Sequence, residues 1–339
     1  MTDLQSFVET EHRDIDWLKG ALQYAVQLEF FTIPPYLTAL WSIKDQRCPA
    51  AVAVREVVVD EMLHMSLACN LLKAIGGLPS LTSRHVLPKY PGPLPGGVKP
   101  GLRVALEGFS SHALQVFMAI EEPEEDISLI EGTRQETYPR IGAFYDAILE
   151  GFHQVKPAMD RTGQLEGYFG ESRETDRIVP KNIGSLEDVR SAIALIKDQG
   201  EGTSQSPFEE DGELAHYYRF KEIAVGRKIV PDPQRGWVHS GVTVEMPECW
   251  QLAEVPEDGY LEGDVPAEVW AQISEFDAIY TRVVKTLEDA WRSGDQGMLH
   301  YALAEMMNKM PPLARSIMST RIGNSPLHYA PSFRFQPKG

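Results

Sequence analysis

Apolar residues recur along most of this chain with the period of an α-helix. Between residues 57 and 77, one stripe of positions spaced three or four apart consists of Val57, Glu61, His64, Ala68, Leu71 and Ile75. This spacing predicts the buried face of an amphipathic helix. Glu61 and His64 stand at the centre of that face, where a carboxylate left alone is costly. We therefore expect the fold to compensate the charge of Glu61.

The same periodicity predicts helices over most of the sequence. Their expected ranges are about 14–44, 49–75, 110–121, 139–155, 186–197, a helix starting near residue 211, 266–292 and 295–319. The first range is one long helix, or two helices joined at Pro34 and Pro35, where proline should break or kink the helix because it lacks a backbone N–H and clashes with the preceding turn. Gly76 and Gly77 should end the second helix.

The segments between these helices differ in composition. Residues 87–101 are rich in proline and glycine, which predicts a long crossover without regular structure. Residues 229–264 mix proline, glycine and β-forming residues, which predicts irregular structure with one short β-hairpin. We expect an all-α bundle in residues 1–230, and in 231–339 an irregular segment followed by a C-terminal helical hairpin that packs on the bundle.

A Glu-x-x-His motif occurs four times along the chain. Residues three apart on a helix share a face, so both side chains can reach one object. A carboxylate oxygen and an imidazole nitrogen are ordinary ligands for iron, manganese or zinc. The four pairs are Glu9/His12, Glu61/His64, Glu150/His153 and Glu213/His216.

Placement on apolar stripes separates these pairs. The spacing of Glu61 and His64 places both on the predicted buried face of the 57–77 helix. Glu213 and His216 are expected to share a helical face with Phe220 and Ile223. The N-terminal pair lies in a polar segment and is expected to be solvated. Glu150 points away from the main apolar face of its helix, so a solvated position is the stronger interpretation for it.

Two single glutamates also fall on apolar stripes. Glu29 is at the centre of a stripe formed by Leu18, Leu22, Ala25, Glu29, Thr32 and Tyr36. Glu121 shares a face with Leu114 and Phe117, whereas Glu122 does not. The choice between Glu121 and Glu150 as the ligand from the third helix stays open.

Together these residues suggest a metal centre. Two single glutamates and two Glu-x-x-His pairs form the ligand set of carboxylate-bridged di-metal helical bundles. The candidate ligands are Glu29, Glu61, His64, Glu121, Glu150, Glu213 and His216. Two iron ions are the first expectation, with manganese or a mixed pair as alternatives. Other interpretations stay open: a buried hydrogen-bonded pair for Glu61 and His64, an ion pair of Glu29 with a basic residue, and helix capping by Glu213.

Charge and cysteine content narrow the classes of partner. The formal charge is −17, from 32 basic and 49 acidic residues, which argues against nucleic acid or an anionic membrane surface. A small-molecule substrate is expected, and a homo-oligomer is compatible with the sequence. Three well-separated cysteines suggest neither a disulfide framework nor a thiolate site. The absence of a signal-peptide pattern and of a membrane-spanning apolar run makes a cytoplasmic location the default expectation.

Six segments carry a family likeness: LQYAVQLEFFTIPPYLTALWSI, EVVVDEMLHMSLACNLLKAIGG, YPGPLPGGVKPGL, FMAIEEPE, IGAFYDAILEGF and GELAHYYRFKEIAVGR. They resemble the ferritin-like domain of the iminophenyl-pyruvate dimer synthase family, which occurs in the violacein and rebeccamycin pathway enzymes that couple two indole-pyruvate imines. The likeness covers roughly residues 15–230, and the closing APSFRFQP also looks like the family's ending.

The resemblance implies a ferritin-like four-helix bundle with a Glu/His metal site. On this sequence the implied ligands are Glu29, Glu61, His64, Glu213 and His216, with either Glu121 or Glu150. The dimer synthases are much longer and carry additional domains, so this chain looks like a stand-alone form and imine coupling is not carried over.

Two functions of different classes follow. The first is a metal-dependent oxidoreductase that uses O2 or peroxide on a small organic substrate, in amino-acid-derived secondary metabolism. The second is a non-catalytic ferritin-like binding or scaffold protein that holds one metal ion or none. Metal storage is a weaker third hypothesis, because residues 229–339 exceed what a storage shell needs.

Overall fold

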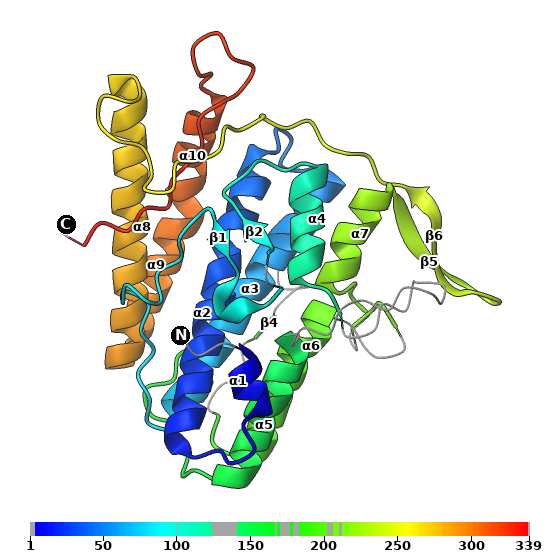
Figure 1. Cartoon of the computed structure of the whole chain (residues 1–339), viewed down its shortest axis with the longest axis vertical. Helices are drawn as coiled ribbons and strands as arrows, with labels where there is room; N and C mark the ends of the chain where they lie inside the picture. The colour runs from blue at the N-terminus through cyan, green and yellow to red at the C-terminus, as the bar shows by residue number, and fades with distance from the viewer. Residues whose placement is uncertain are drawn as a thin grey trace.

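Two long helices, α2 (Ile15–Ser42) and α3 (Pro49–Ala74), pack along each other at the centre of the computed structural model (Figure 1). The structure describes residues 4–99, 101–123, 141–166, 168–169, 177–178, 183–201, 206–209 and 212–337. A short connection joins the two helices, which makes them an antiparallel pair. This pair carries the buried stripes that the sequence predicts.

The other two positions of the bundle are each filled by two shorter helices. One position holds α4 (Ser111–Ile120) and α5 (Ile141–Val155), and the other holds α6 (Leu186–Glu201) and α7 (His216–Val225). Helix α4 packs against α7, and α5 packs against α6 (Figure 1). The ends of α4, α5, α6 and α7 therefore meet at one level of the bundle, beside the middle of α2 and α3.

Helix α2 runs through Pro34 and Pro35 as one long helix without a break, which is the first of the two predicted alternatives. Pro35 has no N–H to donate to the carbonyl of Phe31, which would leave a buried acceptor unsatisfied. The hydroxyl of Tyr90, from the crossover, donates to that oxygen at 2.5 Å. Both prolines are buried, so surrounding contacts hold the helix together at this point.

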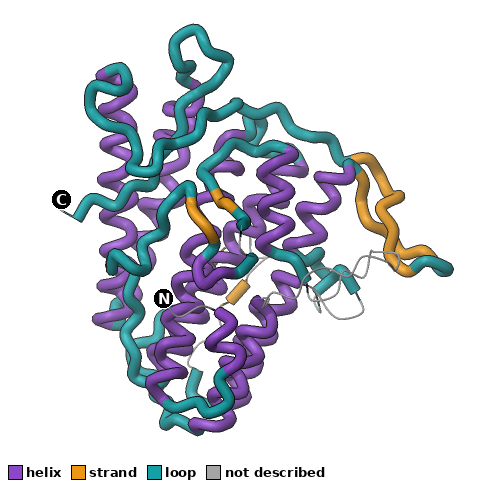
Figure 2. The backbone as a smooth tube through the Cα atoms, viewed as in Figure 1, coloured by secondary structure: helices purple, strands orange, loops and turns teal. Residues whose placement is uncertain are grey.

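Three two-stranded antiparallel ladders decorate the described part of the bundle (Figure 2). They are β1 (Gly92–Pro93) with β2 (Arg103–Val104), β3 (Tyr168–Phe169) with β4 (Arg177–Ile178), and β5 (Arg227–Asp232) with β6 (Gly236–Thr243). The last is the hairpin predicted within 229–264, and it projects from the end of α7 (Figure 1). Two further short elements, α1 (Leu4–Glu9) and the 3-10 turn η1 (Pro95–Gly97), contact each other, with α1 also against α5 and η1 against α2.

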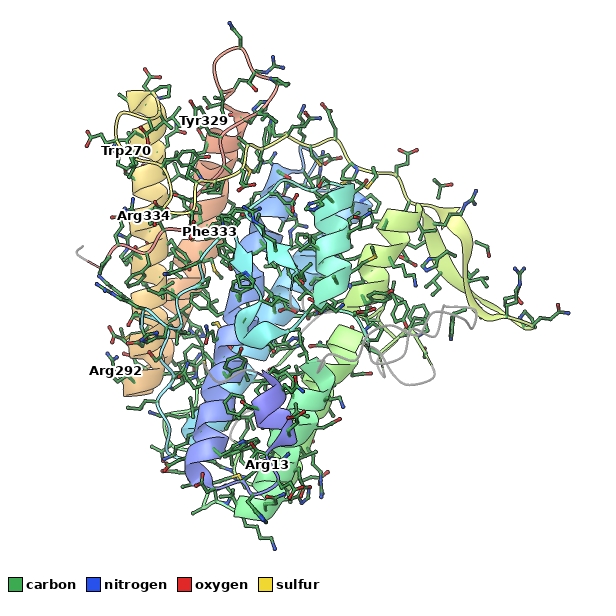
Figure 3. All side chains as sticks on the ribbon, viewed as in Figure 1. Arg13, Trp270, Arg292, Tyr329, Phe333 and Arg334 are labelled. Atoms are coloured by element: carbon green, nitrogen blue, oxygen red, sulfur yellow. The ribbon has the colours of Figure 1, made fainter. Side chains whose placement is uncertain are left out.

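The C-terminal part adds a layer of helices against α2. It consists of α8 (Ala267–Ser293), α9 (Gln296–Asn308) and α10 (Met310–Ser319). The single helix predicted for 295–319 is thus two helices, because Pro311 and Pro312 lack the N–H groups needed to continue α9 and instead occupy the first turn of α10. The final segment has no regular secondary structure, and Phe333 lies within it (Figure 3). The ring of Phe333 stacks on Trp41 of α2, with 6.0 Å between the ring centroids.

One continuous apolar core joins the bundle to this layer, since buried residues of α2, α3, α8, α9 and α10 belong to the same cluster. The division of the chain after residue 230 stays a prediction. None of the helices in the described ranges combines the length and the apolar character needed to cross a bilayer.

Candidate metal centre

Five of the candidate ligands come together at the level where the four short helices α4, α5, α6 and α7 meet. Glu29 lies in the middle of α2, and Glu61 with His64 in the middle of α3. Glu121 is the C-cap residue of α4, and His216 is the first residue of α7. Five side chains from four helices are thus gathered in the interior, each at most 9% exposed.

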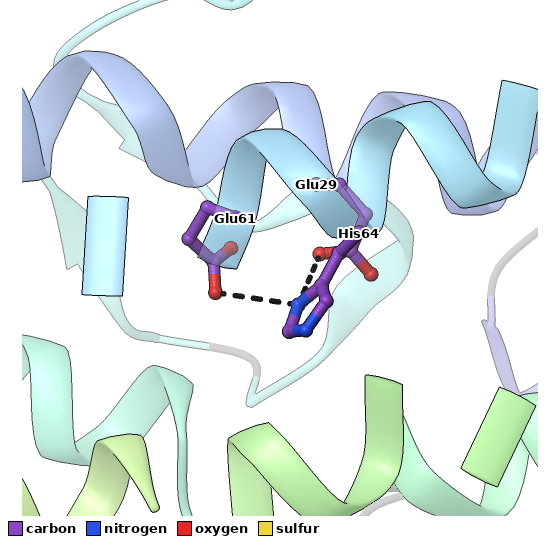
Figure 4. A group of neighbouring side chains, drawn as sticks. All are labelled: Glu29, Glu61 and His64. Atoms are coloured by element: carbon purple, nitrogen blue, oxygen red, sulfur yellow. Dashed lines mark ion pairs between the residues drawn. The ribbon is translucent and has the colours of Figure 1, made fainter. Parts of the chain in front are cut away.

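The five side chains form two overlapping triads. One consists of Glu29, Glu61 and His64 (Figure 4), the other of Glu61, Glu121 and His216, and in each the ligand atoms lie within 4.8 Å of one another. His64 Nδ1 is 3.8 Å from Glu29 Oε2 and 3.7 Å from Glu61 Oε1. His216 Nδ1 is 3.2 Å from the same Glu61 oxygen and 3.5 Å from Glu121 Oε2. Glu61 is therefore shared between two positions, as a bridging carboxylate would be.

One oxygen of each carboxylate is held by a hydroxyl group. Tyr145 donates to Glu29 Oε1, Thr32 donates to Glu61 Oε2 at 2.5 Å, and Tyr36 donates to Glu121 Oε1. The opposite oxygen of each glutamate is the one that faces the histidines. The hydroxyls therefore fix the orientation of the carboxylates and leave one oxygen of each directed into the cluster.

Both histidines point the same ring nitrogen inward. Nε2 of His64 lies 2.8 Å from Gln199 Oε1, and Nε2 of His216 lies 3.2 Å from Asp60 Oδ2. Because both outer partners are acceptors, they favour a proton on Nε2 and leave the Nδ1 lone pair facing the carboxylates. Within the described part of the chain, buried His216 Nδ1 has no hydrogen-bond partner of acceptable geometry. Such an orphaned nitrogen, aimed at carboxylate oxygens, fits a metal ligand.

The cluster carries more negative charge than its protein surroundings neutralise. Among the described residues, Glu29, Glu61 and Glu121 form ion pairs only with the two histidines, and with no lysine or arginine. Burial, together with Glu61, raises the pKa of Glu29 well above its usual range. Burial and the neighbouring Glu121 raise the pKa of Glu61 to about 7. Divalent cations would replace the protons that these acids otherwise retain.

The pKa of His216 moves in the direction expected beside acids. Burial alone would lower it, but the hydrogen bond to Asp60 and the adjacent carboxylates raise it well above its usual value. Without a metal ion, Glu29, Glu61 and His216 therefore tend to keep their protons. The donor set of three carboxylates and two imidazoles suits iron, manganese or zinc, so the residues present fit a two-ion centre.

A comparison with protein families matches residues 22–225, more than half of the chain, to the family described as Ferritin-like. The chain belongs to the Ferritin-like family. A solved ferritin-like protein from Caulobacter vibrioides is similar in fold, with a TM-score of 0.63 and 21% sequence identity, over 94% of this chain and 97% of that one. No curated protein matches the sequence.

Two of the predicted ligands of this ferritin-like chain lie outside the cluster. Helix α7 begins only at His216, so Glu213 precedes the helix instead of sharing its face, and its side chain is 55% exposed. It pairs with the buried Arg219 at 3.3 Å. Glu150 is exposed on α5 and accepts a hydrogen bond from Gln154. Of the two third-helix candidates, the structure brings Glu121 into the cluster and leaves Glu150 at the surface.

Several residues of the site were not singled out from the sequence as part of it. Thr32 and Tyr36 stand on the same stripe as Glu29, three and seven positions further on, so spacing could have assigned them to the centre. Tyr145 belongs to the apolar face of its helix, where a hydroxyl needs a partner. Asp60 and Gln199 gave no such signal, because their roles depend on neighbours more than 130 residues away in sequence.

Proposed function

We propose that this ferritin-like protein binds two metal ions and uses them to oxidise a small organic substrate with O2 or peroxide. Iron is the first candidate, with manganese or a mixed pair as alternatives. The observation that carries the proposal is the pair of overlapping triads centred on Glu61, buried and without a described basic side chain to neutralise them. In a structural ion-pair cluster, arginine or lysine would neutralise these acids, whereas here the raised pKa values of Glu29 and Glu61 leave protons or cations to do so.

Each side chain has a defined task in such a centre. Glu29 and His64 would hold one ion, Glu121 and His216 the other, and Glu61 would contact both. When bound, redox-active ions accept and donate the electrons that pass between substrate and oxidant. The net reaction balances if a substrate that loses two electrons and two protons reduces peroxide to two molecules of water, or O2 to peroxide. The hydroxyls of Tyr36, Thr32 and Tyr145 would keep the carboxylates oriented.

A pocket adjoining the cluster supports a small organic substrate. Its lining includes the cluster residues Glu29, Glu61, His64 and Glu121, further polar side chains from Thr32, Glu122, Tyr145 and Lys197, and apolar side chains from Leu28, Ile120, Ile141 and Ile196. A concave site that combines apolar surface with converging polar groups is typical of small-molecule binding. The resemblance to the dimer synthase domain supports an amino-acid-derived substrate from secondary metabolism. The cytoplasm remains the default location that we propose from the sequence pattern.

Metal content of the purified protein tests the first half of this proposal. After expression with iron supplementation, elemental analysis should find close to two ions per wild-type chain. His64→Ala and Glu29→Ala should each reduce loading strongly, because each removes a ligand from one triad. Glu150→Gln and Glu213→Gln are matched controls, since both glutamates belong to a Glu-x-x-His pair but lie outside the cluster. Wild-type loading in both cluster variants would contradict the proposal.

Reaction with an oxidant tests the second half. Iron-loaded protein, reduced without air, should change its ultraviolet–visible spectrum when O2 or peroxide is added, and the His64→Ala protein should not. Loaded protein that stays unchanged under both oxidants would instead support the scaffold function. An anomalous-scattering map at the iron edge would place the ions directly.

A further inference from the structure

The two halves of the centre differ in the group behind each histidine. His216 donates its outer N–H to Asp60, a carboxylate, whereas His64 donates to the side-chain amide oxygen of Gln199. A carboxylate behind a metal-binding histidine raises the basicity of the imidazole and adds a negative charge near the ion. A neutral amide orients the ring but adds no net charge. The His216 half therefore has the stronger donor.

The helix ends around the two halves are similar in kind. The His216 half lies beside the first residue of α7 and the C-cap of α4, while the His64 half lies beside the first described turns of α5 and the last described turn of α6. The charge of Asp60, which the Gln199 amide lacks, is the difference between the groups directly behind the two histidines.

Access also differs between the halves. All three ligands of the His64 half, Glu29, Glu61 and His64, line the pocket. In the His216 half, Glu61 and Glu121 also line it, whereas His216 does not and is completely buried, as is Tyr36, the hydroxyl donor to Glu121. An ion in the His64 half would have only pocket-lining ligands, and an ion in the His216 half would be held from behind by a histidine that the pocket does not reach.

We propose that Asp60 makes the His216 half the tighter metal position, so that the two ions bind in sequence and the second, weaker one occupies the pocket-facing His64 half. This inference rests on the two-ion site of the proposed function and adds an order of binding to it. The shared Glu61 increases the difference in affinity between the first and the second ion, because an ion already bound to Glu61 repels the next one. Asp60 acts here as a positioning residue through His216.

Equilibrium dialysis of the metal-free full chain against Co2+ tests the proposal without any activity assay. Cobalt is stable in air as the divalent ion, and elemental analysis counts it. The wild-type protein should bind in a tight and a weak step. Asp60→Asn should weaken the tight step by about 10- to 100-fold, the usual effect of removing such a partner, and leave the weak step unchanged. Gln199→Glu places a carboxylate behind His64 and should tighten the weak step, while the tight step stays unchanged.

The location of the first ion gives an independent readout. At one equivalent of Co2+, an anomalous map of crystals of the wild-type protein should show density between Glu61, Glu121 and His216. Density in the other triad, or an Asp60→Asn protein in which only the weaker step changes, would overturn the inference and leave the proposed function standing. A wild-type protein that binds no cobalt, iron or manganese would overturn both. If Asp60→Asn lost its helical circular dichroism, Gln199→Glu and the map would still decide.

Discussion

The two sides of the α2–α3 pair bury very different chemistry. On the side facing α4 and α7, the helices present Glu29, Glu61 and His64 to further acids and a second histidine. On the side facing α8 and α10, the same helices present Phe30, Leu37, Met62 and other apolar groups to an apolar cavity and its aromatic lining. Because both sides are equally removed from water, burial alone does not explain the acids. The metal ions of the proposed function would.

The largest expected effect comes from breaking the acidic side at its shared residue. Glu61→Gln removes the one carboxylate common to both triads, so both ions should be lost together. Elemental analysis after iron-supplemented expression should fall from about two ions per chain to nearly none, since each position keeps only two ligands. The Glu150→Gln protein should retain full loading. A Glu61→Gln protein with one tightly held ion would show that the triads are independent.

Asp277 on α8 sharpens the comparison, because it is a buried acid of the C-terminal layer whose hydrogen-bond partners among the described residues are Ser332 and the backbone of Arg334, not further acids. Burial raises its pKa from an ordinary value of 3.8 to about 7, although Ser332 and the backbone N–H of Arg334 donate to it. Between about pH 4 and pH 7, Asp277 therefore keeps its proton in the folded protein and loses it in the unfolded chain. Its contribution to stability is complete below pH 4, declines between pH 4 and 7, and stays lost above.

The size of this decline is about 4 kcal/mol, at about 1.4 kcal/mol for each unit by which the pKa is raised. Urea unfolding of metal-free wild-type and Asp277→Asn proteins at several pH values would measure it, because other titrations are common to both. The difference in unfolding free energy between the two proteins should change with pH in this window. A constant difference would mean that Asp277 is ionised in the folded protein.

A cavity mutation on the apolar side should act on stability alone. Leu37→Ala removes a buried side chain that lines the apolar cavity, and such truncations cost about 2–5 kcal/mol. Denaturant unfolding should show this loss, while metal content stays at the wild-type value. A fall in metal content in the still-folded variant would mean that the two sides of α2 are coupled more tightly than the comparison implies.

The smallest effect is expected from the hydroxyl groups that orient the carboxylates. Tyr36→Phe removes the donor to Glu121 and leaves the ring in place between Phe117 and Phe220. Metal affinity should fall by about tenfold, at the lower end of the range for outer partners of ligands. Cobalt dialysis measures it, and Tyr217→Phe on α7, a hydroxyl outside the cluster, is the matched control. Equal affinities in both proteins would remove Tyr36 from the centre.

The fold was largely predictable because its helices repeat apolar residues with a clear period. The points at which helices begin, end or continue were less predictable. Continuity through Pro34 and Pro35 depends on a hydroxyl from Tyr90, which lies more than fifty residues away. The helix that carries His216 was expected to start near residue 211, yet it starts at His216 itself, with Glu213 drawn to Arg219 instead. A periodic pattern cannot show which charged partner a residue at a helix end will choose.

By itself, the sequence determined that Glu29, Glu61, His64 and His216 lie on faces too apolar for charge, because helical spacing fixes which side chains share a face. It also identified Glu121 as a candidate, but not over Glu150. Only the tertiary structure brought Glu121 and not Glu150 into the cluster, left Glu213 outside it, and placed Asp60 and Gln199 behind the two histidines. Those outcomes depend on distances between elements far apart in the chain, which periodicity along a single helix does not contain.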